Sequence, residues 1–152
     1  MTATQARYRY PLVKLEALYA HRLEQARLSL AAAQRRLDQH QEQIEQLRSA
    51  LGRSLKDWNA ASERAPRFDP ASHAAVRESL AAHHSRLRVA LAHERELRAE
   101  VERSQEQTAQ AYRRTQIVER HKNQSKREFE LEVVRSDQRE ADAAWPSWRE
   151  RL

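Results

Sequence analysis

The stretch Ala65-Pro66-Arg67-Phe68-Asp69-Pro70 is the place in the middle of the chain where one long helix must end and another can begin. Pro66 lacks a backbone N–H and disfavours the helical conformation at the residue before it, so a preceding helix should end near Arg64. Asp69 is a preferred N-cap, and Pro70 suits the first position of a helix. A turn of about five residues between two long helices usually folds them back antiparallel. The chain is therefore predicted to form a helical hairpin.

On both sides of this turn, residues that could pack between two helices recur every seven positions. We call the line of such residues along a helix its seam. The first repeat consists of Leu23, Leu30, Leu37, Ile44, Leu51 and Trp58, with Ala26, Ala33, His40, Leu47 and Ser54 between them. The second consists of Leu80, Leu87, Glu94, Val101, Thr108, Thr115, Lys122 and Phe129, with Val76, His83, Ala90, Leu97, Ser104, Ala111, Val118 and Ser125 between them. This spacing is typical of a coiled-coil seam. Antiparallel pairing about Phe68 places residue i opposite about residue 136 − i.

We predict an all-α chain with one helical-hairpin domain over residues 1–152. Helix one should span residues 11–64, the turn 65–69, a longer helix two 70–142 and a tail 143–152. Residues 1–10 show no hydrophobic period and are predicted to be a mobile basic lead-in. The 152 residues include one glycine and 33% charged side chains, which is typical of long helices and indicates a narrow apolar seam without a deep pocket. Residues beyond about Arg127 should have no helix to pair with.

Several kinds of function are disfavoured by the sequence. A chain with one glycine has no phosphate-binding glycine motif, and no G-x-S-x-G motif is present. The seven histidines do not form an H-E-x-x-H motif, so we expect no metal, and we expect His40 and His83 to be polar seam residues. The absence of cysteine excludes disulfides, no apolar run is long enough to span a bilayer, and the first residues lack the apolar region of a secretory signal. We expect a non-enzymatic, cytoplasmic protein without cofactor or small-molecule substrate.

Charge is concentrated at the end of the hairpin that carries both termini. The formal net charge is +6, and seven basic residues from Arg103 to Arg127 are opposed only by Glu106 and Glu119. Together with basic residues near the N-terminus they are predicted to form a basic collar, which consists of Arg7, Arg9, Lys14, Arg22, Arg113, Arg114, Arg120, Lys122, Lys126 and Arg127. Beyond the collar the sign reverses, because Glu128, Glu130, Glu132, Asp137, Glu140 and Asp142 outnumber Arg135 and Arg139. The tail carries Trp145 and Trp148, which are either docking anchors for a partner or fold back onto Leu12, Tyr8 or Tyr10.

Three kinds of partner fit such a collar and seam. A nucleic acid would use the same arginines, but the neighbouring acidic residues would repel phosphate. A purely structural, self-associating coiled coil would need a second apolar stripe along its full length, whereas Leu28, Leu55 and Leu91 are scattered. A third possibility is an acidic protein surface that takes the arginines and the apolar anchors together.

The segment YPLVKLEALYAHRLEQARLSLAAAQRRL, within a cysteine-free helical hairpin whose termini lie together, resembles the YscO/FliJ group of type III secretion proteins. The resemblance covers the whole chain in architecture and about residues 10 to 37 in motif. It implies a central stalk or adaptor of the export apparatus, peripheral to the inner membrane. In this family the end with both termini inserts into the hexameric ring of the secretion ATPase and the turn end reaches toward a membrane-embedded export gate. Some members also bind secretion chaperones.

The resemblance also suggests which residues would act. The basic collar, Trp145 and Trp148 would bind the ATPase. The face of helix two near the turn would contact the export gate, through Val76, Leu80, His83 and Leu87. These four are also seam residues, and the alternative is that they serve packing alone.

Overall fold

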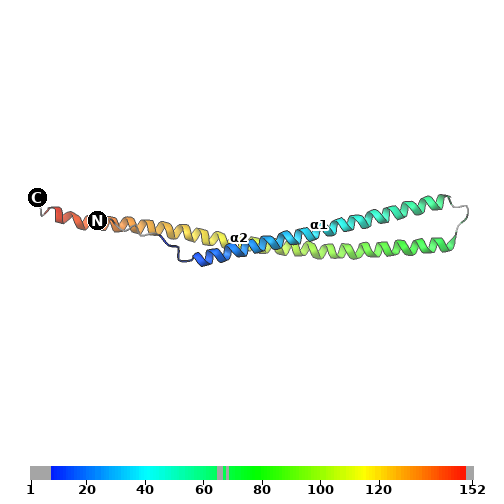
Figure 1. Ribbon diagram of the computed structural model, residues 1–152, viewed down its shortest axis with the longest axis horizontal. Coiled ribbons are helices and arrows are strands. Elements are labelled where there is room, and N and C mark those ends of the chain that lie inside the picture. Colours follow the sequence, from blue (N-terminus) through cyan, green and yellow to red (C-terminus); the bar gives the residue numbers. More distant parts are fainter. Residues whose placement is uncertain (1–7, 65–66, 68, 150–152) are drawn as a thin grey trace. The chain divides into compact units, whose positions relative to one another are not determined.

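The computed structural model describes residues 8–64, 67 and 69–149, with side chains up to residue 143. In this part of the chain it contains two helices, α1 (Val13–Arg64) and α2 (Pro70–Arg149), as Figure 1 shows. Helix α2 has 80 residues and α1 has 52. The predicted all-α hairpin with a longer second helix is confirmed.

Both helices meet the turn at the predicted residues. Helix α1 ends at Arg64 and α2 begins at Pro70, while Ala65, Pro66 and Phe68 lie outside the described residues. The Asp69 carboxylate accepts hydrogen bonds from the backbone N–H of Ala71 at 3.1 Å and of Ser72 at 3.3 Å. The Ser72 hydroxyl donates a further bond at 2.5 Å, and these bonds hold the pKa of Asp69 below its usual value. Asp69 is therefore the N-cap of α2.

The contacts between the helices fall into two units, which are described separately. Unit 1 combines residues 1–25 with residues 109–152, and unit 2 covers residues 26–108. Unit 1 thus holds the start of α1 and the C-terminal part of α2. Unit 2 holds the rest of both helices and the turn.

In unit 2, α1 and α2 run antiparallel in the predicted register. Arg36 forms an ion pair with Glu100 at 2.5 Å, and Gln41 donates to Glu94 at 3.0 Å. The residue numbers add to 136 in the first pair and to 135 in the second, as the expected pairing requires. Closer to the turn the rings of Trp58 and His73 lie 5.7 Å apart.

The predicted seams are the sides on which the helices are buried. Every seam position from Leu23 to Trp58 and from Val76 to Phe129 is buried or half-buried. His40 and Glu94, two polar seam residues, find partners across the helices: His40 Nε2 donates to the Ala90 carbonyl at 2.8 Å, and Glu94 accepts from Gln41. His83, the other histidine predicted for the seam, has a buried Nδ1 without a hydrogen-bond partner in the described part of the chain. The buried residues are Tyr10, Leu23, Ala33, Ile44, Leu97, Val101, Ser104 and Val118. The core is therefore a narrow stripe one or two side chains wide, as the composition predicts.

Helix α2 runs further than the sequence suggests. It was predicted to end at about Asp142, with a tail from 143, but it continues to Arg149. Pro146 lies inside this last part of α2, although a proline within a helix costs one backbone hydrogen bond. The alanines at 141, 143 and 144 are strong helix formers that precede it directly.

The single glycine offers a simple test of helix stability. Gly52 lies inside α1 with an ordinary helical backbone, and an added Cβ would meet nothing within 4 Å. Gly52→Ala should therefore raise the free energy of unfolding by up to ~1 kcal/mol, because alanine restricts the unfolded chain without crowding the folded one. Urea unfolding followed by circular dichroism measures the change. A loss of stability would contradict a regular helix at this position.

Candidate functional site

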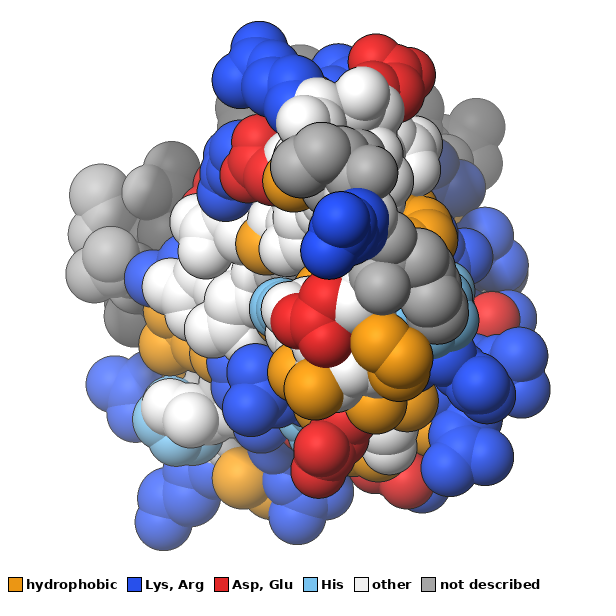
Figure 2. Space-filling view, turned by 90° about the vertical axis from the view of Figure 1, so that its right-hand side faces the viewer, with side chains coloured by type: hydrophobic (Ala, Val, Ile, Leu, Met, Phe, Trp, Pro, Cys, Tyr) orange, Lys and Arg blue, Asp and Glu red, His pale blue; other side chains and the backbone are white. Residues whose placement is uncertain are grey.

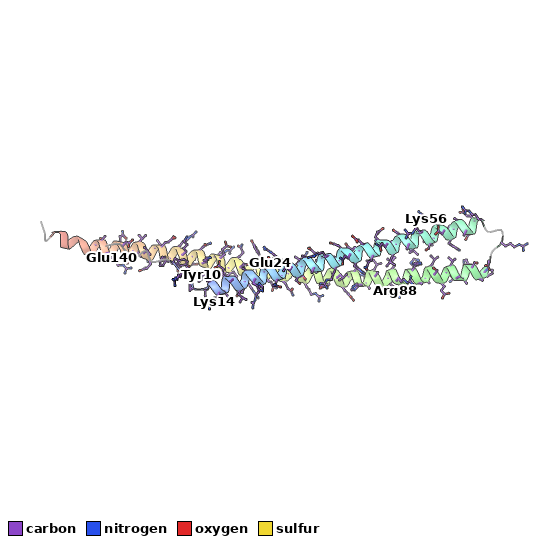
Figure 3. The ribbon with its side chains drawn as sticks, in the orientation of Figure 1. Tyr10, Lys14, Glu24, Lys56, Arg88 and Glu140 are labelled. Carbon is purple, nitrogen blue, oxygen red and sulfur yellow. The ribbon has the colours of Figure 1, made fainter. Side chains whose placement is uncertain are left out.

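Tyr8 and Tyr10, which precede α1, are fastened to α2 by a cluster of aromatic and charged side chains in unit 1, which we call the tyrosine clasp. It consists of Tyr8, Tyr10, Glu16, His121, Lys122 and Phe129. The Tyr10 hydroxyl donates to the Val118 carbonyl at 3.4 Å and lies 3.1 Å from His121 Nδ1. The rings of Tyr8 and Phe129 lie 5.5 Å apart. Figure 3 shows Tyr10 beside the C-terminal part of α2.

An ion pair completes the clasp. Lys122 Nζ donates to both carboxylate oxygens of Glu16, at 2.8 and 3.1 Å, and lies 5.9 Å from the centre of the Tyr10 ring. The hydrogen bond to Glu16 raises the pKa of Lys122, and burial raises the pKa of the Tyr10 hydroxyl. Lys122 is thus held between the helices and is half-buried.

The clasp corrects one expectation from the sequence. Residues 1–10 are predicted to be a mobile lead-in, but Tyr10 is only 6% exposed and packs on α2. Residues 1–7 lie outside the described residues, so the correction concerns residues 8–10. The prediction relied on helical periodicity, and a residue that precedes the helix cannot show it. The presence of Tyr8 and Tyr10 could have suggested burial. A tyrosine ring that packs on a partly polar seam buries apolar surface, while its hydroxyl can form a hydrogen bond.

The predicted basic collar lies in unit 1, and most of its charges face solvent. Its exposed members are Arg9, Lys14, Arg22, Arg113, Arg114, Arg120, Lys126 and Arg127. Lys126 lies 3.8 Å from Glu130, and Lys122 belongs to the clasp. Arg7 lies outside the described residues. The exposed collar can offer several guanidinium groups to carboxylates at once.

Beyond Phe129, which contacts Tyr8, the described side chains of α2 are open to solvent. All side chains from residue 130 to residue 143 are exposed, which confirms the predicted overhang. It carries three large apolar side chains that are open to solvent: Leu131 is 57% exposed, Val133 37% and Val134 58%. The side chains of Trp145 and Trp148 lie outside the described part. An exposed apolar group on a helix with no neighbour is a candidate contact for a partner.

Two of the exposed apolar residues, Leu131 and Val134, belong to a second helical repeat that was not predicted from the sequence. The seam would continue from Phe129 through Glu132 and Ser136, whereas Leu131 and Val134 lie on another face of α2. Steps of three and four residues connect them to exposed positions upstream and downstream. This outward stripe consists of Ile117, Arg120, Gln124, Arg127, Leu131, Val134, Gln138 and Ala141. The apolar periodicity of this stripe is hard to recognise in the sequence, because two of its positions are arginines.

The predicted gate-binding residues lie in unit 2. Val76, Leu80, His83 and Leu87 are half-buried in the seam. Beside the turn, Val76 also lines a groove of about 620 Å³, whose other walls are Trp58, Ala61, Ser62, Arg67, Asp69, Ser72 and His73. Figure 2 views the molecule from the turn end, where hydrophobic side chains reach the surface beside acidic and basic ones. Sequence reasoning did not anticipate this groove, because it is formed by both helices together.

No group of three or more His, Cys, Asp or Glu side chains in the described residues could hold a metal ion. Neither helix, as far as it is described, has a stretch that is apolar and long enough to cross a membrane.

No family model, no curated protein and no solved structure matches this chain.

Proposed function

We propose that this chain is a non-enzymatic stalk or adaptor of a type III secretion export apparatus. Unit 1 docks in the ring of the secretion ATPase, and the turn end couples the ring to the export gate. The protein acts in the cytoplasm at the inner membrane, and secretion chaperones are further candidate partners. The observation that carries the proposal is the exposed segment 130–143 of α2 beside the basic collar in unit 1.

The overhang supports docking because it offers apolar surface that the hairpin itself does not use. Leu131 and Val134 are each more than half exposed. Burial of such side chains in a partner contributes roughly 25 cal/mol per Å² of apolar surface and mainly slows dissociation. Exposed arginines next to them would bring a partner with an acidic surface into contact and speed association.

The tyrosine clasp supports the same role by positioning the collar. Tyr10 and the Glu16–Lys122 pair fix the first residues of the hairpin against α2. Arg9 and Lys14 are thereby held in the same unit as Arg120 and Arg127. A preorganised set of charges binds with less loss of conformational freedom than the same charges on a loose segment.

The turn end supplies the proposed contact with the export gate. The groove lined by Trp58 and Val76 is open to solvent and combines apolar walls with Arg67 and Asp69. Leu80, His83 and Leu87 support this end by packing in the seam, and any contact they make with the gate would use their exposed edges.

Hydrolysis of ATP by the cognate secretion ATPase tests the proposal. The rate should rise when the protein is added, most strongly at ATPase concentrations where the ring is only partly assembled, because a ligand of the ring stabilises it by mass action. Reversal of Arg114, Arg120 and Arg127 to Glu should slow association about tenfold or more at low salt, since it removes the electrostatic attraction. Stopped-flow binding and the hydrolysis assay measure the two effects.

A matched variant distinguishes the effect of where the arginines lie from the effect of the net charge. Arg53, Arg77 and Arg88 are exposed residues of unit 2, and their reversal to Glu also takes the net charge from +6 to zero. This control should associate much faster than the collar variant. Equal slowing by both sets, or undiminished stimulation by a collar variant that also lacks residues 128–152, would contradict docking through unit 1.

A further inference from the structure

One flank of unit 2 carries a groove with an apolar floor and basic walls, which we call the arginine groove. It has a volume of about 340 Å³ and is lined by His84, Leu87, Arg88, Leu91, Ala92 and Arg95 of α2. Arg88 and Arg95 are exposed, and neither forms an ion pair in the described part of the chain. Their guanidinium groups can therefore bind carboxylates of a partner.

The carboxylates that lie next to the groove in the sequence are engaged elsewhere. Glu94 accepts hydrogen bonds from Gln41 at 3.0 Å and from Arg98 at 2.7 Å. Glu96 Oε2 lies 3.1 Å from His93 Nδ1. The positive charge of the groove is thus not neutralised by these two neighbours.

Two leucines that look scattered in the sequence lie on the same flank as this groove. Gln41 of α1 and Arg98 of α2 both donate to Glu94, so they mark one flank of unit 2. Leu55 follows Gln41 by two heptads, and Leu91 precedes Arg98 by one, so both leucines occupy positions on that flank. Leu55 is 37% exposed and Leu91 is half-buried. Apolar surface from both helices therefore accompanies the arginines.

We propose that the arginine groove binds an acidic amphipathic helix of a partner protein. Arg88 and Arg95 are seven residues apart, which is about 10 Å along a helix, so carboxylates seven positions apart on one partner helix reach both. An apolar residue between these carboxylates covers Leu91, and another covers Leu55. The contact lies neither on the collar nor in the groove beside the turn, so it adds a partner to those of the proposed function.

The flank suits a helix better than it suits other anions. Positions for helix packing follow one another along α2 in steps of four and three residues: Arg77, Ala81, His84, Arg88, Leu91 and Arg95. A nucleic acid would bind the arginines through its phosphates, which gain nothing from Leu55 and Leu91. A membrane surface is flat and would not reach a half-buried leucine within a groove. An acidic helix satisfies the charges and the leucines together.

Fluorescence anisotropy of a labelled peptide tests the proposal. The probe is a synthetic heptad peptide with leucine on one face and glutamate on both flanks of that face, and its matched peptide carries lysine in place of glutamate. The protein is the full chain with Arg114, Arg120 and Arg127 reversed to Glu, which removes the attraction of the collar and leaves unit 2 unchanged. The acidic peptide should bind at low salt, and the basic peptide should not.

Variants in unit 2 locate the binding. Reversal of Arg88 and Arg95 to Glu should weaken binding of the acidic peptide about tenfold or more, because attraction becomes repulsion. Reversal of Arg53 and Arg86 is the control: it changes the net charge equally in the same unit, but neither residue lines the arginine groove. The control should change the affinity less than about twofold. Leu55→Gln should weaken binding about fivefold, since an apolar contact is lost.

Several outcomes would overturn the proposal. Circular dichroism first shows that each variant keeps its helices. Absence of peptide binding, or equal weakening by the two charge reversals, would mean that the groove does not recognise an acidic helix. A single-stranded oligonucleotide or a phosphatidylserine vesicle that binds through Arg88 and Arg95 in place of the peptide would assign the groove to another anion. A dimer that dissociates when these arginines are reversed would assign it to a second copy. The collar is reversed throughout and no ATPase is present, so the outcome is independent of the proposed function.

Discussion

Replacement of Tyr10 by alanine is expected to cost about 3 kcal/mol in the free energy that holds unit 1 together. The ring is 6% exposed, covers α2 beside Val118 and forms the centre of the tyrosine clasp. Without it, Tyr8 and the Glu16–Lys122 pair would have to hold the first residues against α2. The start of α1 should then open long before the rest of the hairpin.

Hydrogen exchange of the backbone amides of residues 13–22 measures this effect directly. Tyr10→Phe is the matched control, because it keeps the ring and loses only the hydroxyl, at a cost of about 1 kcal/mol. If alanine and phenylalanine variants exchange alike, the ring contributes little and the clasp depends on the hydroxyl and the ion pair. If neither changes exchange, the clasp does not fasten α1 at all.

In unit 2 the largest expected loss comes from Ile44→Ala, which should lower the free energy of unfolding by about 3 kcal/mol. Ile44 is 3% exposed at the centre of the seam, and the narrow core has few neighbours that could fill the space. The midpoint of chemical or thermal unfolding, followed by circular dichroism, measures the change.

Leu28→Ala is the control for this prediction, since Leu28 lies on the same helix and in the same unit but is 53% exposed. Its replacement should change stability by less than about 0.5 kcal/mol. Similar losses in the two variants would mean that Leu28 is covered in solution, and that the seam is not what stabilises unit 2.

The sequence predicts most of this fold because few physical rules decide it. Burial in a two-helix structure selects side chains three and four residues apart, so Leu23, Ile44 and Val101 could be placed in the seam from spacing alone. Pro66, Asp69 and Pro70 fix where one helix ends and the next begins. With the turn located, simple counting gives the partners of Arg36 and Gln41.

The candidate site was harder to predict, for two physical reasons. Tyr10 reaches α2 from a segment without helical repeat, so periodicity could not reveal its burial. Leu131 and Val134 follow a repeat of their own, but Arg120 and Arg127 share that stripe and make it look solvated. The collar, by contrast, could be located from charge alone. Basic residues that lie close together along a helix form a basic surface whatever rotamers their side chains adopt.

A core only one or two side chains wide also affects how such a chain can change over time. Eight described residues are buried, and most of the others touch water. Mutations at those outer positions leave the hairpin intact, and even seam positions need apolar character and suitable size more than one particular residue. Relatives of this chain can therefore drift far apart in sequence while they keep the same two helices. Such relatives should share the seven-residue spacing of apolar residues, a proline-containing turn and a change of charge along the second helix. They need not share identical residues at aligned positions.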